Sequence, residues 1–271
     1  MAKCREEFPK TFTEYVDIVD KFQSRHNHSI WYRGCGKSKY KLIPSFYRHL
    51  NIKDIKKRDD NLENKLMTRF KQRSIPFHNK SLEKEWEALF FMQHSGVPTR
   101  LLDWTENPFI AFYFAVMSAE YKYKKKIKKY TSPASIWILD PVVWNQHALR
   151  HISYDQGILS TPDEPLKGYL PNTKFSDMSA FPVALNGTHN SSKIVAQRGV
   201  FTIFGQNITP MEILYEKKSF PDNCLVKITI DQNLLPAMKN SILNNGITES
   251  VVFPDLDGLA REIKREFKFE A

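Results

Sequence analysis

The sequence is poor in cysteine, and the three cysteines that it has are scattered. Cys4, Cys35 and Cys224 form no CxxC pair and no cluster with histidine. Such spacing gives no indication of a disulfide framework or of a zinc site. His26 and His28 stand two residues apart without a third ligand nearby, so we interpret them as surface histidines. We therefore expect no bound metal.

Long apolar runs are also absent. No stretch reaches the roughly 20 apolar residues that a membrane-spanning helix needs. The N-terminal segment MAKCREEFPKTFTEY is charged and lacks the apolar core of a secretory signal. We therefore expect a protein without membrane association that stays in the cytoplasm.

Positive charge, by contrast, is abundant. The chain has 40 Lys and Arg against 30 Asp and Glu, a net charge of +10 and a sequence pI of about 9.3. A positive field attracts polyanions such as nucleic acid, and also phosphorylated small molecules. Six lysines are concentrated within residues 122–129. We interpret this block as a solvated loop or helix face, and contact with nucleic acid is the alternative.

Hydrophobic patterning predicts an α+β protein. Apolar residues make up 41% of the chain, which is enough for a sizeable core. Residues 11–25 have helical spacing, and Thr11 and Glu14 have the spacing of a capping box. A short buried strand is expected at residues 29–34. Further helices are expected at residues 60–75, at 81–96 with Ser81 as cap and Gly96 as stop, from Pro108 onward, at 234–246 and at 256–267.

The second half of the chain is richer in strand patterns. The β-type runs are SIWILD, GVFTIFG, CLVKITID and SVVFPD, separated by turns that contain Pro, Asn or Gly. No repeat and no flexible linker divides the chain. We therefore expect one domain over residues 1–271, in which a helical N-terminal half packs on a β-rich C-terminal half. Residues 151–192 are expected to form a loop-rich insertion.

The first motif with chemical content is Trp31-Tyr32-Arg33-Gly34. A strand that ends in Arg and Gly places a guanidinium at the strand end, beside a backbone that is free to bend. Such an arginine can bind a phosphate or carboxylate through two parallel hydrogen bonds. Pairing with a structural carboxylate is the alternative.

The longest motif is QHSGVPTRLLDWTENPFIAFYFA, in which polar residues interrupt an apolar segment. In a structural interpretation, Arg100 and Asp103 form a buried ion pair, and Asp103 or Thr105 caps the helix that follows. In a functional interpretation, Gln93 and His94 end a helix at a cleft, where His94 is a hydrogen-bonding or acid-base group. The sequence leaves both interpretations open.

Two further motifs lie nearer the C-terminus. In AQRGVFTIFG, Gln197 and Arg198 precede a strand through Phe201, and we interpret them as an ordinary turn. In GITESVVFPDLDGLA, Glu249 comes directly before an expected strand, where its carboxylate either reaches an active site or faces water. Asp255 is expected to cap the helix that follows.

Taken in order, these segments resemble the FRG domain, a bacterial and phage-associated family named for a Phe-Arg-Gly signature. Here the signature reads Tyr32-Arg33-Gly34. The resemblance continues through IPSFYR, QHSGVPTRLLDWTENP, AQRGVFT and VVFPDLDGLA, and so spans residues 31–260. It implies a role in mobile-element conflict or antiphage defence, with an antitoxin or a phage protein as partner, but no particular reaction.

The YRG motif is also similar to the first motif of Arg-Ser-Glu-type ADP-ribosyltransferases, and TESVVFP has the outline of their last motif. Two features depart from that family: Ser250 stands where the catalytic Glu is expected, and the middle Ser-Thr-Ser element has no counterpart. The resemblance implies an ADP-ribosyltransferase-like fold, NAD as substrate, and Arg33, Glu249 and His94 as catalytic residues. It implies that NAD is held by Tyr32, Gly34, Gln93, Arg100, Trp104, Gln197 and Phe201.

The leading hypothesis is thus an NAD-using toxin or antiphage defence effector that modifies a nucleic-acid or protein acceptor. One alternative is a nucleic-acid-binding protein or nuclease that uses Arg33, His94, Arg100 and Asp103 at a phosphate. Another is a non-catalytic sensor of a nucleotide or a phage protein. The transferase hypothesis predicts that Arg33 and Glu249 face one cleft.

Overall fold

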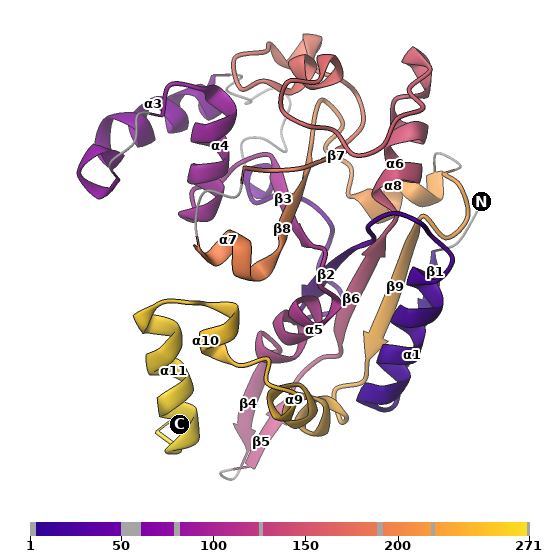
Figure 1. The fold of residues 1–271 in the computed structure, drawn as a ribbon, viewed down its shortest axis with the longest axis vertical. Coiled ribbons are helices and arrows are strands. Elements are labelled where there is room, and N and C mark those ends of the chain that lie inside the picture. The colour runs from indigo at the N-terminus through magenta and orange to yellow at the C-terminus, as the bar shows by residue number, and fades with distance from the viewer. Residues whose placement is uncertain are drawn as a thin grey trace.

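The chain forms an α+β fold, as the sequence patterns predicted. The computed structural model describes residues 4–49, 61–78, 82–124, 127–188, 192–217 and 220–269. In these segments a mixed seven-stranded sheet has the strand order β1-β9-β6-β2-β3-β8-β7, in which β1 and β9 are parallel and the other neighbours antiparallel (Figure 1). The strands are β1 (Arg5–Glu7), β2 (Trp31–Cys35), β3 (Leu101–Thr105), β6 (Ala134–Leu139), β7 (Val183–Leu185), β8 (Gly199–Ile203) and β9 (Leu225–Ile230).

Helices cover both faces of this sheet, because side chains of successive strand residues point to opposite faces. In β2, Trp31 belongs to a core shared with α4, α6 and α8, whereas Tyr32 belongs to a core shared with α1, α5 and α9. The helices are α1 (Phe12–Gln23), α3 (Leu62–Ser74), α4 (Glu85–His94), α5 (Pro108–Met117), α6 (Pro141–Ala148), α7 (Ser192–Gln197), α8 (Met211–Lys217), α9 (Leu235–Asn244), α10 (Glu249–Val252) and α11 (Leu256–Glu266).

The sheet splits between β2 and β3. Each of these strands pairs with its other neighbour, β6 or β8, over five residues. Between the described residues of β2 and β3, only Tyr32 and Thr105 are paired. Beyond that pair the strands diverge, so backbone groups on the facing edges need other partners.

Several local predictions are confirmed. Thr11 caps α1 by accepting a hydrogen bond from the Glu14 backbone N–H at 3.1 Å. Asp255 caps α11 by accepting from the Gly258 N–H at 2.7 Å. After α4 ends, Gly96 takes a φ of +80°, the left-handed conformation that glycine adopts most easily. Ser81, the expected cap of α4, lies outside the described residues.

The expected cap of α5 is wrong. The Asn107 side chain caps this helix, accepting hydrogen bonds from the Phe109 N–H at 2.9 Å and the Ile110 N–H at 3.4 Å. Thr105 instead accepts a hydrogen bond from the Asn107 N–H at 3.0 Å. Asn107 stands directly before Pro108, where an N-cap residue is expected when proline opens the helix.

The expected strand at SVVFPD is also wrong, because Glu249–Val252 form the short helix α10. Paired valines favour a strand locally. Here a tertiary contact overrides that preference, since the Glu262 carboxylate of α11 accepts a hydrogen bond from the Ser250 N–H at 2.9 Å. The two helices therefore form one unit at the C-terminal end of the chain (yellow in Figure 1).

The described residues of the lysine block lie in strands and not in the expected loop or helix face. They form a separate two-stranded antiparallel hairpin of β4 (Tyr121–Lys124) and β5 (Ile127–Tyr130). The described residues of 151–188 form mainly loops and short 3-10 turns such as Glu164–Tyr169, together with strand β7. Within the segments that the structure describes, no helix has both the length and the apolar character to cross a bilayer.

Gly34 should be intolerant of any side chain. A Cβ at this position would overlap the backbone carbonyl of Ala111 and lie 2.6 Å from the backbone nitrogen of Ala115, because β2 packs directly on α5. Backbone on a packed helix cannot move aside easily, so we expect Gly34→Ala to lower the free energy of unfolding by about 3 kcal/mol. Urea denaturation measures this.

Gly157→Ala is the matched control, since an added Cβ there meets only the Val142 side chain at 3.9 Å. We expect its stability to stay close to that of the wild type. Equal free energies of unfolding for the two variants would contradict the close packing of β2 on α5.

Candidate functional site

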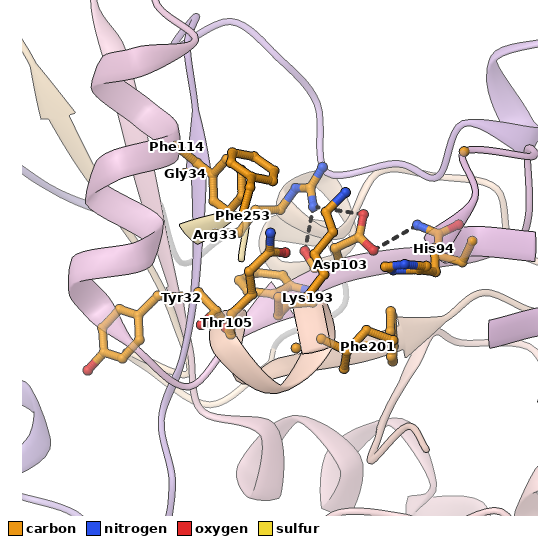
Figure 2. Close-up of a pocket in the computed structure, with 16 residues that line it drawn as sticks. Tyr32, Arg33, Gly34, His94, Asp103, Thr105, Phe114, Lys193, Phe201 and Phe253 are labelled. Atoms are coloured by element: carbon orange, nitrogen blue, oxygen red, sulfur yellow. Dashed lines mark hydrogen bonds and ion pairs between the residues drawn. The ribbon is translucent and has the colours of Figure 1, made fainter. Parts of the chain in front are cut away.

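A cavity of about 390 Å³ lies at the split between β2 and β3 (Figure 2). Its volume falls within the roughly 300–1,000 Å³ of small-molecule sites. Its walls come from β2, the end of α4, β3, α5, α7, β8 and the segment after α10. The lining residues are Tyr32, Arg33, Gly34, Gln93, His94, Gly96, Asp103, Trp104, Thr105, Phe114, Lys193, Ile194, Gln197, Gly199, Phe201 and Phe253.

Arg33 bridges the split in the sheet. Its guanidinium donates a hydrogen bond to the backbone carbonyl of Asp103, and one of its nitrogens lies 3.8 Å from the Asp103 carboxylate. Figure 2 shows the two side chains pointing toward each other across the cavity. The Arg33 side chain is 21% exposed and that of Asp103 is 57% exposed. Arg33 thus replaces the missing strand pairing while both charges remain accessible from the cavity.

Gln93 and Thr99 hold the Asp103 carboxylate in place. The Gln93 side-chain amide donates to Asp103 at 2.9 Å, and its carbonyl accepts from the Thr99 hydroxyl at 2.5 Å. Thr99 is fully buried. Because the Gln93 carbonyl accepts from Thr99, the Gln93 N–H₂ group faces the Asp103 carboxylate. Gln93 and Arg33 therefore orient this carboxylate from two sides.

His94 lies at the end of α4, in the position that the functional interpretation gave it. Partial burial, together with the nearby positive charge of Lys193, holds the pKa of His94 below its ordinary value of 6.5, and the Asp103 carboxylate opposes this shift. The imidazole is therefore neutral at pH 7. A neutral imidazole can accept a proton or donate and accept hydrogen bonds.

Aromatic side chains form one wall of the cavity. The rings of Phe114 and Phe253 meet edge to face with centroids 5.9 Å apart. The Lys193 ammonium lies 5.2 Å from the Phe253 ring centroid, a cation–π distance. Phe201 stacks on Phe90 beneath the cavity, with centroids 5.2 Å apart. The cavity thus combines cationic groups with apolar rings, a combination suited to a ligand with both phosphate and planar parts.

The predicted turn into β8 is present at Arg198, but Gln197 is the last residue of α7, and the segment also connects β8 to β3. The Thr105 hydroxyl donates to the Gln197 carbonyl at 2.6 Å, and the Glu106 N–H donates to the Arg198 carbonyl at 3.2 Å. Arg198 takes a φ of +45°, a left-handed conformation that costs a non-glycine residue free energy. The Gln197 amide donates to the Val252 carbonyl at 3.0 Å and so connects the turn to α10.

Most of the residues selected from the sequence line this cavity. They are Tyr32, Arg33, Gly34, Gln93, His94, Trp104, Gln197 and Phe201. Two of these residues border the cavity but direct their side chains away from it. The Tyr32 ring points away from Arg33 into the core shared with α1 and α5 (Figure 2). Trp104 is 2% exposed and donates from its indole to the Thr202 hydroxyl at 3.1 Å.

Arg100 does not reach the cavity, and its expected pairing with Asp103 is wrong. Its guanidinium is 1% exposed and donates to the Glu63 carboxylate at 2.7 Å, to the Phe204 carbonyl at 2.7 Å and to the Tyr169 carbonyl at 2.5 Å. Side chains alternate along an extended strand, and the buried direction at Arg100 leads toward α3 rather than toward Asp103. Arg100 therefore joins α3 to the loop-rich segment.

Glu249 also lies outside the cavity lining. Its side chain is buried, and both carboxylate oxygens accept hydrogen bonds from Arg265 of α11, at 2.9 and 3.0 Å. The expected strand would have carried Glu249 toward the sheet, whereas the helix α10 turns it toward α11. The structure therefore does not bring Arg33 and Glu249 to one cleft.

The carboxylate that does face the cavity is that of Asp103. The transferase hypothesis did not include Asp103, which was paired with Arg100 or, in the nuclease alternative, placed at a phosphate. A signal was nevertheless present. Asp103 is the one charged residue in the segment LLDWT, and in β3 it is the one exposed position among four buried ones. A charged residue inside an otherwise buried strand needs a partner or a cavity. Lys193 and Phe253 also line the cavity, and no local pattern identified them.

Groups of three or more His, Cys, Asp or Glu side chains that could hold a metal ion do not occur among the described residues. The His26 and His28 imidazoles instead lie against the buried Asp140 carboxylate, at 3.3 and 2.9 Å. Asp140 also caps α6 by accepting from the N–H groups of Val142 and Val143.

Removing Arg100 should destabilise the fold more than removing Arg33. Arg100→Ala leaves the Glu63 carboxylate buried without its charge partner, and we expect a loss of about 3–5 kcal/mol in the free energy of unfolding. Arg33→Ala removes the hydrogen bond to the Asp103 carbonyl and an ion pair with a mostly exposed carboxylate, so it should cost about 2 kcal/mol. Chemical denaturation of both variants measures the difference. A stable Arg100→Ala protein would contradict the structural role assigned to this arginine.

The pKa of His94 reports the electrostatics of the cavity directly. We expect an NMR titration to place it below 6.5 in the wild type. Lys193→Ala removes a neighbouring positive charge and should raise the pKa, whereas Asp103→Asn removes a negative charge and should lower it further. Lys174→Ala, at an exposed lysine outside the cavity lining, is the control and should leave the pKa unchanged. A lower pKa in Lys193→Ala, or a higher pKa in Asp103→Asn, would contradict the geometry.

Comparison with known proteins gives a family match for part of the chain. Residues 28–124 match the FRG domain. The matched segment contains YRG, IPSFYR and QHSGVPTRLLDWTENP, while the two later motifs lie outside it. No match was found among curated proteins or among solved structures. The segment that supplies Arg33, Gln93, His94 and Asp103 to the cavity is thus the one whose sequence supports the FRG-domain family.

Proposed function

We propose that the cavity binds a nucleotide and that the chain is an NAD-using enzyme of the ADP-ribosyltransferase type, with Asp103 in the role first given to Glu249. The observation that carries this proposal is the meeting of Arg33 and Asp103 at the split in the sheet, where both charges face the cavity.

Cleavage of the bond between nicotinamide and ribose develops positive charge on the ribose. A carboxylate held close to that charge stabilises the transition state. Asp103 suits this task because Gln93 and Arg33 already orient it, so little reorganisation is needed during the reaction. Its side chain is also more than half exposed, so that a ribose can approach it.

The remaining lining residues suit the other parts of the ligand. Arg33 and Lys193 supply positive charge for the phosphates, and Arg33 can bind a phosphate through two hydrogen bonds. Phe114, Phe201 and Phe253 supply apolar surface for a planar ring. His94, neutral at pH 7, is placed to accept the proton of an attacking water or acceptor group.

A nucleotide sensor without catalytic activity is the second candidate. It is favoured by the contact between Arg33 and Asp103, since a carboxylate that is partly neutralised by a neighbouring cation stabilises a developing positive charge less well. In either case the role as a toxin or an antiphage defence effector rests on the FRG resemblance.

Incubation of the purified protein with NAD, with and without cell extract, tests the proposal through the release of nicotinamide. We expect Asp103→Asn to lower the turnover rate roughly 10²–10³-fold, as loss of one transition-state contact does. Arg33→Ala should mainly weaken NAD binding, by about tenfold or more, because it removes a charge-assisted contact to phosphate.

Asp222→Asn is the matched control, since this carboxylate is exposed and lies outside the cavity lining. It should keep wild-type turnover. NAD binding that depends on Arg33, without any release of nicotinamide, would favour the sensor. Turnover that survives in Asp103→Asn would contradict the assignment of Asp103.

A further inference from the structure

The lysine-rich hairpin has two different faces. Cross-strand pairing places Tyr121 opposite Tyr130 and Tyr123 opposite Lys128, and it places Lys122 opposite Lys129. Because side chains alternate along each strand, the tyrosines and Lys128 share one face while Lys122 and Lys129 share the other. Four lysines of the block, Lys122, Lys124, Lys128 and Lys129, thus lie in one small, separate two-stranded element.

This arrangement is electrostatically unfavourable for the isolated protein. Like charges directly opposite each other in a strand pair are destabilising, and Lys122 and Lys129 are such a pair. Residues 121–130 contain no Asp or Glu to offset them. The adjacent Glu120 is bound to Lys37 at 2.7 Å and accepts a hydrogen bond from Thr131 at 3.0 Å, so it offsets the charge of Lys122 only in part. A bound polyanion would relieve the repulsion.

The tyrosine face supplies surface for stacking. At the base of the hairpin, Tyr130 packs against the core, whereas Tyr121 is 38% and Tyr123 54% exposed. Lys128 lies 3.5 Å from the centroid of the Tyr121 ring, so that a cation is held beside the exposed rings. Basic side chains alternating with exposed aromatic rings are the combination by which proteins bind unpaired bases and their phosphates.

We propose that the β4–β5 hairpin binds single-stranded nucleic acid, with lysines contacting phosphates and Tyr123 stacking on a base. This site is separate from the cavity, since none of its residues lines the cavity. Single strands fit better than duplexes, because only unpaired bases present a face to Tyr123.

Fluorescence anisotropy of a labelled oligouridylate, titrated with the full chain at several salt concentrations, tests the proposal. We expect the Lys122→Ala/Lys129→Ala double variant to bind about tenfold more weakly at low salt. Its slope of log affinity against log salt should be shallower by about 1.4, which corresponds to two lost phosphate contacts. Tyr123→Ala should weaken binding about tenfold at every salt concentration, whereas Tyr123→Phe keeps the ring and should bind like the wild type.

Lys174→Ala/Lys217→Ala is the matched control, because it removes the same charge from two exposed lysines elsewhere. Removal of a like-charge pair should not lower the melting temperature of the hairpin variant. If this temperature is unchanged, a loss of binding is not due to unfolding. Three results would each overturn the proposal. They are equal affinities of the two double variants, wild-type affinity of Tyr123→Ala, and stronger binding to a duplex or to anionic phosphatidylserine vesicles than to the single strand.

Discussion

The hydrogen bond from Arg33 to the backbone carbonyl of Asp103 holds together two strands that otherwise separate. In a continuous sheet this carbonyl would accept from a strand neighbour. Here a side chain takes that place, so the sheet remains connected while a cavity opens between β2 and β3. The same guanidinium that maintains the split also supplies positive charge to it.

Neighbouring residues also stabilise the opening between β2 and β3. Gly34 lets β2 approach α5 closely on the far side of the split, where any side chain would overlap the helix backbone. Thr99 and Gln93 fix the orientation of Asp103 from the neighbouring loop and α4. The turn at Gln197 and Arg198 fastens β8 to the end of β3 and reaches α10. Residues far apart in the chain thus converge on one polar opening in an apolar sheet.

Much of the fold could be predicted because local physics and tertiary packing agree. The capped helix at residues 12–23 and the apolar strands around Trp31 and Ile136 have patterns with a single good interpretation. Prediction failed where a tertiary contact decides the outcome. Glu262 stabilises a helical turn at Val251 and Val252, although valines favour a strand. Glu63 of α3 pairs with Arg100, which one sequence interpretation had paired with Asp103.

The candidate site was predictable in part for the same reason. Gln93 and His94 could be selected because their motif places polar groups at the end of a helix, and Arg33 because it is a charged residue within an apolar strand. Glu249 was selected only because its segment has the outline of a known motif. In the structure both of its carboxylate oxygens accept from the Arg265 Nε–H, so Glu249 joins α10 to α11. Lys193 and Phe253 reach the cavity only through the fold, which no local pattern encodes.

A crystal structure of the protein grown with NAD tests the central claim most directly. We expect electron density for the nucleotide in the opening between β2 and β3, with a phosphate oxygen within hydrogen-bond distance of the Arg33 guanidinium and the ribose beside Asp103. A nucleotide bound elsewhere, with the contact of Arg33 and Asp103 unchanged and the opening filled only by solvent, would contradict it.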